Sequence, residues 1–431
     1  MNARSGATVV RMFRGAGAFL AVSTLVVILA VFCASRAEAI PAFSRAIKTE
    51  CTTCHTIFPQ LNEFGQAFEK NGFVWPGAVP LSKKVKVTQT EEERKSAEFI
   101  KLSGLPSVLP LSATLSASYL YNDKVEDEFD QKRYSAEIFG AGAFAGDLIG
   151  FWFNESLGNQ DTTATNSLSG PSQVYFVVRD PWGIPVHLKA GRFSPDLSLW
   201  KTNLNGRMLS MGASVGGFAV NGAQSGLELS SIIASRVIAV VGMNDRNNSS
   251  DEKNPHSVND FYGRIGVKIG GADYQGKEPD IDLDKDSVWD YLAISCSAFG
   301  YSGTLSKGDG VDHDLTRLGV EAEATYKKAI LMLGATFGEN NANDDKPLKS
   351  TALSAEAEYV FTAKVAAAVR YDSLAIDGKD QRTVITPGII YAPLQNFKLK
   401  LNAAIDSNPK GADTGKAVKN TTATLTASLS F

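Results

Sequence analysis

The last nine residues, Ala423–Phe431, read A-T-L-T-A-S-L-S-F and alternate strictly between apolar and polar side chains. A period of two predicts a β-strand with one apolar and one polar face. The sequence therefore predicts that its final strand separates an apolar environment from a polar one.

The same alternation recurs in earlier segments of the chain, at Leu111–Asn122, Ala363–Asp372 and Asn396–Asp406. Segments of about ten residues with this repeat, separated by turns, are typical of transmembrane β-barrels. Closure of the barrel leaves no strand edge exposed to hydrocarbon. A terminal strand that ends on Phe431 also resembles the assembly signal of outer-membrane barrels. The alternative is a soluble β-sandwich, which the inward Lys, Glu and Arg of these strands disfavour.

From Leu111 onward the pattern predicts about sixteen antiparallel strands, joined alternately by short and long connections. Short turns are expected on the periplasmic side, together with the N-terminal part of the chain, and long loops outside. One connection, Gly271–Asp286, is long but falls on the periplasmic side. Either a strand is miscounted there or that turn is specialised. The expected short turns lie at Gly146, Asp180–Ile184, Ile233–Ser235, Lys327–Lys328, Thr362 and Pro393–Gln395.

The N-terminus has the layout of a secretory signal peptide over residues 1–39. Arg4, Arg11 and Arg14 precede an apolar run, Ala16–Phe32, and Ala37-Glu38-Ala39 forms a small-x-small cleavage site. The alternative is an uncleaved membrane anchor, for which the run is barely long enough.

Cys51-Thr52-Thr53-Cys54-His55 is the attachment signature of a c-type haem. Cys51 and Cys54 can each form a thioether to the haem, and His55 can bind the iron as proximal ligand. The same Cys spacing without the His would indicate a redox pair or half of a zinc site. No second Cys pair completes a zinc site, so covalent haem is the favoured interpretation.

Residues 40–75 are expected to form a small helical cytochrome c domain. Pro59 suits a first helical turn, Leu61, Phe64 and Phe68 recur at helical spacing, and Asn71-Gly72 is a helix stop. In so small a domain the apolar stripe is expected to pack against the haem. Residues 76–110 are interpreted as a linker or plug segment, and residues 111–431 as the barrel. The predicted fold class is mainly β.

Composition agrees with a secreted membrane protein. The chain of 431 residues has 43 basic and 46 acidic side chains; loss of four Arg and one Glu with the signal peptide leaves 39 and 45, a net charge of −6. This balance gives no nucleic-acid signature. Cys296, in an apolar stretch, is expected to pack as a small hydrophobe.

The stretch P-A-F-S-R at residues 41–45, followed by C-T-T-C-H-T-I-F-P-Q-L-N-E-F-G-Q-A-F-E-K-N-G-F at residues 51–73, resembles the fused monohaem cytochrome–porins of the bacterial outer membrane. The resemblance covers residues 41–73; over the barrel it is architectural. It implies a cytochrome followed by a barrel of about sixteen strands. It also implies oxidation of extracellular Fe(II) and an outer-membrane location, with the haem domain on the periplasmic side or inside the lumen. The site residues that it implies are Cys51, Cys54 and His55 for the haem, and Pro59, Leu61, Asn62, Phe64, Gly65 and Phe68 for the haem-packing helix.

The partners expected on this interpretation are outer-membrane lipid, extracellular Fe(II) and a periplasmic cytochrome c or similar electron acceptor. Two alternatives stay open. The chain could be an electron conduit for another extracellular donor or acceptor, or a passive porin whose haem domain is only a plug.

A sixth iron ligand is not evident, because residues 40–110 contain no Met and no His besides His55. His187 is a candidate, since it alternates with apolar neighbours and is expected to face the lumen. Met208 and Met211 are further candidates, because the long connection that holds them could fold inward.

Two acidic clusters are solvated loops or strand faces in the simplest interpretation. Asp123, Glu126, Asp127, Glu128 and Asp130 could hold Fe(II) transiently. Asp280, Asp282, Asp284 and Asp286 could bind Ca²⁺ or dock a basic periplasmic protein.

Overall fold

The computed structural model describes part of the chain. The described residues are 53–57, 60–74, 111–122, 131–144, 148–159, 173–181, 184–198, 209, 222–245, 260–277, 292–306, 312–341, 347–378, 381–394, 396–407 and 420–430. Among them, no helix is both long and apolar enough to cross a membrane.

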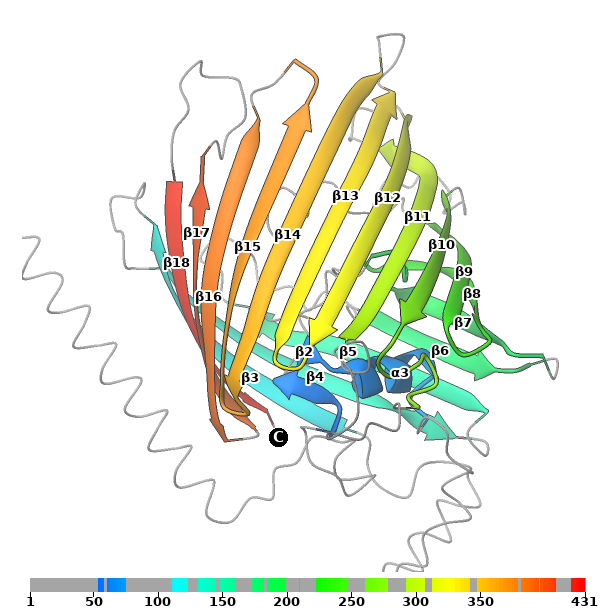
Figure 1. Cartoon of the computed structure of the whole chain (residues 1–431), viewed down its shortest axis with the longest axis horizontal. Helices are drawn as coiled ribbons and strands as arrows, with labels where there is room; N and C mark the ends of the chain where they lie inside the picture. The colour runs from blue at the N-terminus through cyan, green and yellow to red at the C-terminus, as the bar shows by residue number, and fades with distance from the viewer. Residues whose placement is uncertain are drawn as a thin grey trace, which may run out of the picture.

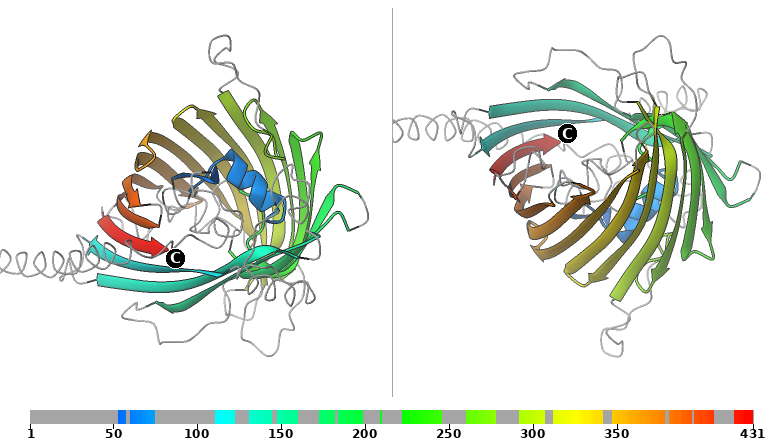
Figure 2. Two further views of the ribbon diagram at one scale, coloured as in Figure 1. Left: turned by 90° about the horizontal axis from the view of Figure 1, so that it is seen from below. Right: turned by 90° about the horizontal axis from the view of Figure 1, so that it is seen from above.

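In this part of the chain, sixteen antiparallel strands, β3 to β18, close into one barrel (Figures 1 and 2). Each strand pairs with its neighbours in sequence, and β18 closes the ring by pairing with β3, where Leu425 lies opposite Tyr119. The predicted barrel of about sixteen strands is confirmed.

The first half of the barrel comprises β3 (Leu111–Asn122), β4 (Gln131–Phe144), β5 (Ile149–Asn159), β6 (Gln173–Arg179), β7 (Val186–Phe193), β8 (Gln224–Ile233), β9 (Val237–Asp245) and β10 (Asp260–Ile269). The second half comprises β11 (Leu292–Ser306), β12 (Asp312–Tyr326), β13 (Ala329–Asn341), β14 (Leu348–Thr362), β15 (Val365–Ile376), β16 (Arg382–Leu394), β17 (Phe397–Asp406) and β18 (Asn420–Ser430).

The short turns lie together at the end of the barrel that also holds the C-terminus, at the bottom of Figure 1. The long connection on that side is genuine, because β10 ends at Ile269 and β11 begins at Leu292. The strand count was therefore right and this turn is specialised. Its first residues fold back under the barrel, where the Tyr274 N–H donates to the Ser235 carbonyl at 2.9 Å.

The two faces of the wall differ as the alternation predicts. Along β14, Ser354, Glu356 and Glu358 are buried on the lumen side, whereas Leu353 and Tyr359 are exposed on the outer side. Apolar side chains cover the outside of the other strands in the same way, among them Phe261, Ile265, Leu318, Val320, Phe337, Val369, Ile385 and Leu401. An outer apolar surface with a polar lumen is the arrangement that a membrane requires.

Cys296 corrects one expectation. It lies on β11 with its side chain exposed on the outer face of the barrel. Because Val267, its register partner on β10, is also exposed, this position faces outward and Cys296 does not pack in a core.

The N-terminal segment lies inside the barrel. It consists of β1 (His55–Ile57), β2 (Gln60–Leu61) and the helix α3 (Glu63–Lys70). Viewed along the barrel in Figure 2, this segment is enclosed by the ring of strands, near the short-turn end.

Candidate functional site

The described part of the Cys51–His55 motif is tied to the start of α3 by Asn62. The Asn62 backbone N–H donates to the Cys54 carbonyl at 3.0 Å, and its side-chain Nδ2 donates to the Thr53 carbonyl at 3.1 Å. Asn62 is also the N-cap of the helix, because its Oδ1 accepts from the Gly65 N–H at 2.9 Å. Asn62 thus links Thr53 and Cys54 to the helix N-terminus through its side chain and its backbone.

Gly65 allows the closest approach in this link. A Cβ at this position would lie 2.1 Å from the Cys54 carbonyl oxygen. Any larger residue would therefore clash with that oxygen unless the backbone shifted. The helix begins at Glu63, so the expectation that Pro59 occupies its first turn is wrong. Pro59 itself and Cys51 lie outside the described residues.

The apolar positions of the segment divide between two environments. Leu61 and Phe64 are partly exposed, whereas Phe68 is buried. Phe68 packs in a cluster on the barrel wall, with Phe73, Tyr175, Val177 and Phe193. At least one face of α3 therefore binds the wall.

The N-terminal end of α3 is fixed to the specialised turn after β10. Glu63 Oε1 pairs with Lys268 Nζ at 3.1 Å, and Glu63 Oε2 accepts from the Ala272 N–H at 3.0 Å. The Lys268 ammonium also lies 5.4 Å from the centre of the Tyr274 ring. Burial raises the pKa of Tyr274 to about 12, so its phenol is neutral beside this ion pair.

The C-terminal end of α3 is fixed to the wall by an ion-pair hub at Asp196. Asp196 accepts from Lys70 at 2.7 Å and from Arg264 of β10 at 2.9 Å, and all three side chains are buried or nearly so. Next to it, Arg179 Nη2 donates to Asn71 Oδ1 at 3.0 Å. Since a buried charge is tolerated only when it is paired, these contacts hold the segment in one position.

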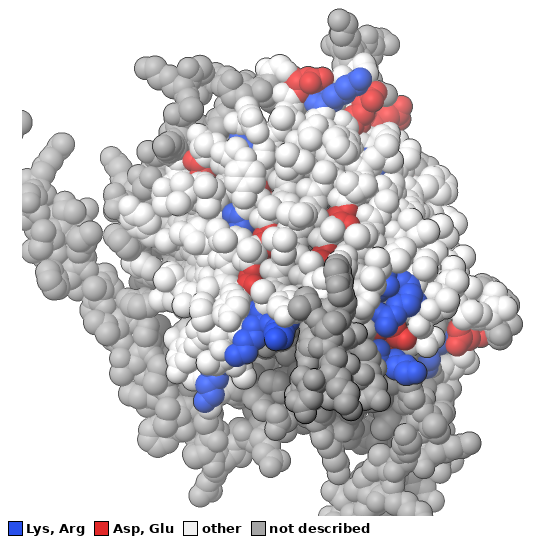
Figure 3. All heavy atoms as spheres, viewed as in Figure 1, with Lys and Arg blue, Asp and Glu red and all other residues white. Residues whose placement is uncertain are grey.

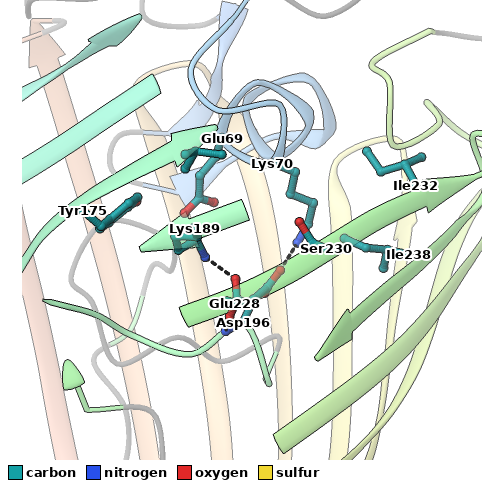
Figure 4. Close-up of a pocket in the computed structure, with 10 residues that line it drawn as sticks. Glu69, Lys70, Tyr175, Lys189, Asp196, Glu228, Ser230, Ile232 and Ile238 are labelled. Atoms are coloured by element: carbon teal, nitrogen blue, oxygen red, sulfur yellow. Dashed lines mark hydrogen bonds and ion pairs between the residues drawn. The ribbon is translucent and has the colours of Figure 1, made fainter. Parts of the chain in front are cut away.

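A pocket lies between α3 and the wall formed by β6–β9 (Figure 4). Glu69 and Lys70 enter it from the helix, and Lys189 and Glu228 meet each other in an ion pair on the wall side. Glu228 also accepts from the Tyr262 hydroxyl at 2.8 Å and from the Asp196 N–H at 2.9 Å. Half of the residues that line the pocket are charged, and Lys70, Lys189, Asp196 and Glu228 among them already have protein partners.

Phe73 anchors the chain just after the helix. It has a left-handed backbone, with φ of 63°, and stacks on Trp152 of β5 at a ring-centre distance of 5.5 Å. Gly150, also on β5, makes room for this turn, since a Cβ there would lie 2.1 Å from the Gly72 carbonyl oxygen.

Residues 194–198 and 209, which are described parts of the long connection after β7, pack on the lumen side of the wall. Leu197 is fully buried in a cluster with Tyr262 and Tyr301, and Ser198 donates to Glu321 of β12. Leu209 packs on Ala366, Ala368 and Ile390 of β15 and β16, which lie half-way round the closed strand order from β7. The prediction of an inward fold is confirmed at these positions. Met208 and Met211 lie outside the described residues.

His187 is buried on the lumen side of β7, as predicted. Its Nδ1 lies 3.8 Å from Asp180 Oδ1, too far for a hydrogen bond. Its register partner is Arg179, which holds Asn71 at the end of α3 remote from His55. A role for His187 as sixth ligand stays a prediction.

Within the described ranges, no group of three or more His, Cys, Asp or Glu side chains is placed to hold a metal ion. Both acidic clusters singled out in the sequence, Asp123–Asp130 and Asp280–Asp286, lie outside those ranges.

The described half of the motif fits a c-type haem. Cys54 and His55 are adjacent and both residues are partly exposed, on a backbone that Asn62 and Gly65 fix to α3. One thiol beside an imidazole is the chemistry that thioether attachment and axial ligation need.

Comparison with known proteins supports the barrel. No protein-family model and no curated protein sequence matches the chain. Among solved structures it is similar to the anion-selective porin from Comamonas acidovorans, with a TM-score of 0.52 and 12% identity over 74% of this chain and 98% of that one. It is similar to the outer-membrane channel DcaP of Acinetobacter baumannii, with a TM-score of 0.52 and 11% identity over 75% and 97% of the two chains. The trimer form of OmpT from Vibrio cholerae gives a TM-score of 0.52 and 11% identity over 74% and 98%. The chain has the porin fold.

Proposed function

We infer that this chain is an outer-membrane cytochrome–porin, in which a c-type haem on Cys51, Cys54 and His55 lies inside a barrel lumen. The observation that carries the proposal is the position of Cys54 and His55 on a segment that the lumen wall holds at both ends of α3. A loosely tethered domain would not need a buried hub such as Asp196.

The proposed reaction is oxidation of extracellular Fe(II). Each Fe(II) gives up one electron and becomes Fe(III), and a periplasmic cytochrome c or similar carrier accepts that electron. The haem, when bound, supplies a one-electron redox centre whose potential the protein tunes by ligation and burial.

The residues of the chain have distinct roles in this proposal. Cys51 and Cys54 hold the group covalently, and the His55 imidazole binds its iron. The pairs Glu63–Lys268 and Lys70–Asp196 fix the segment, and the barrel carries it into an insulating layer about 25 Å thick. Product Fe(III) would stay outside the cell, which avoids insoluble deposits within it.

A passive porin is the second candidate, because the similar solved structures are porins and channels. In that case the N-terminal segment would be a plug without redox chemistry. An electron conduit for another extracellular donor or acceptor would have the same barrel and the same haem segment, so it is a variant of the first proposal.

Spectra of the purified protein separate these candidates. Anaerobic Fe²⁺ added to oxidised protein should sharpen the visible bands in the manner of a ferrous c-type haem, and His55→Ala should stop the reaction. Cys51→Ala and Cys54→Ala should abolish covalent haem staining on gels. A haem that dithionite reduces but no ferrous source reduces would leave the general conduit. A purified protein that passes ion current freely would leave the passive porin with its haem-containing plug.

A further inference from the structure

The rim at the short-turn end of the barrel carries lysines on two neighbouring hairpin turns. Lys327 and Lys328 form the turn between β12 and β13, and Lys364 lies in the turn between β14 and β15; all three are exposed. The turns adjoin, because Lys328 Nζ donates to the Phe361 carbonyl at 3.2 Å and the Lys328 carbonyl accepts from the Val360 N–H at 2.9 Å. Basic side chains gather at this rim in Figure 3.

Aromatic side chains on the outer face border these lysines. Tyr359 and Phe361 form an edge-to-face pair with ring centres 5.0 Å apart, and both are about half exposed. Lys327 Nζ lies 5.4 Å from the centre of the Tyr326 ring. Exposed aromatic residues at the end of an apolar strand face mark the level of lipid headgroups. The lysines therefore lie at the level of the lipid phosphate groups.

Among the described residues, acidic side chains do not balance the charge of Lys328 and Lys364. Within the described part of the chain, neither Lys328 nor Lys364 takes part in an ion pair. The opposite rim differs, since the exposed Lys349 lies directly across the strand pair from Glu339. These two turns thus offer cations to an external anion.

We propose that Lys328 and Lys364, with Tyr359 and Phe361, bind the phosphate of an anionic phospholipid in the periplasmic leaflet. The site rests on the proposed outer-membrane location but not on the haem. The ammonium groups pair with the headgroup phosphate, and the acyl chains lie on the exposed Leu331, Leu333 and Tyr359. An anionic lipid fits because Lys at a membrane surface is attracted to anionic headgroups and aromatic rings sit at their depth.

Native mass spectrometry of the full chain in detergent micelles tests the site, with dioleoyl-phosphatidylglycerol as probe and dioleoyl-phosphatidylcholine as neutral control. The wild type should retain phosphatidylglycerol in preference to phosphatidylcholine. The double variant Lys328→Gln/Lys364→Gln should bind it roughly 5- to 25-fold more weakly. Lys328→Arg/Lys364→Arg should keep binding, and Lys349→Gln at the opposite rim should behave as wild type.

Equal retention of phosphatidylglycerol by the double Gln variant, or no preference over phosphatidylcholine, would overturn the proposal. A soluble polyglutamate peptide that binds the wild type and displaces the lipid would also overturn it, and would assign the patch to an acidic protein partner. Heat-modifiable migration on gels confirms that each variant is folded. Failure of the barrel to insert into vesicles, or absence of haem staining, would instead count against the proposed function.

Discussion

The two halves of the lumen wall use their charged side chains differently. In β6–β10 and the segment after β7, Arg179, Asp196 and Lys268 pair with Asn71, Lys70 and Glu63 of the N-terminal segment. In β14–β17, the charged side chains pair mainly within the wall. There Arg370 contacts Glu356 and Asp372, and Arg382 contacts Asp406. One contact with the N-terminal segment also falls in this half, because Gln60 Nε2 donates to Glu358 Oε2 of β14. The first half is a docking face for both ends of α3, and the second is a wall held mainly by its own ion pairs. Substitutions in the first half should therefore move the segment, whereas those in the second half should weaken the barrel.

The largest effect is expected in β14–β17, the half held mainly by its own ion pairs. Arg370→Met leaves the buried carboxylates of Glu356 and Asp372 without their cation. Loss of one partner from a buried pair costs about 3–5 kcal/mol. Heat-modifiable migration should show a lower unfolding temperature, with no rise in ion conductance from the molecules that remain folded. A conductance rise equal to that of the docking-face variants would remove the distinction between the halves.

On the docking face, Asp196→Asn removes the carboxylate that the buried cations Lys70 and Arg264 share. Docking of the segment should weaken by about 3 kcal/mol. Ion conductance in planar bilayers should rise well above the wild-type level, while haem staining persists because the thioethers are unaffected. An unchanged conductance, with a normal unfolding temperature, would show that the hub does not hold the segment.

A steric change should give a smaller effect on the same face. Gly150→Val places side-chain carbons where the Gly72 carbonyl now lies, which displaces Phe73 from Trp152. Overpacking of this kind costs about 1–3 kcal/mol. Trp152 fluorescence should change, and conductance should rise modestly. Gly263, where a Cβ meets only ordinary contacts, provides the matched control Gly263→Ala.

The smallest effect is expected at the N-terminal end of the helix. Glu63→Gln keeps an acceptor for the Ala272 N–H but removes the charge beside Lys268. Because Glu63 is partly exposed, the expected loss is about 1 kcal/mol. Proteolysis of the segment should be slightly faster, and the difference should shrink at high salt as the ion pair is screened. A salt-independent difference would point to the hydrogen bond rather than the charge.

The barrel was readable from the sequence because each strand carries a local period of two, from Leu111–Asn122 to the terminal strand. The motif at Cys51–His55 predicts a haem from contiguous residues alone, and that assignment stays a prediction. The start of α3 was misplaced, because Asn62 caps the helix through a contact with the Cys54 carbonyl that spacing does not reveal.

The docking face was not predictable, because its members are far apart in sequence. Lys70 meets Asp196, and Glu63 meets Lys268, across a lumen that only barrel closure creates. One signal was available: the odd long connection after β10 marked the turn that reaches Glu63 through Ala272. Cys296 was misjudged because an apolar strand neighbourhood can face lipid as well as a core.

Cleavage of the folded protein tests the central claim, a haem held in the lumen by the docking face, most directly. A protease that cuts between residues 75 and 110 should leave haem absorbance co-eluting with the folded barrel on size exclusion, because Asp196 and Lys268 still hold the segment. Boiling should then release a small haem-stained fragment. Elution of the haem fragment apart from a barrel that is still folded, or a barrel with no haem at all, would contradict the account.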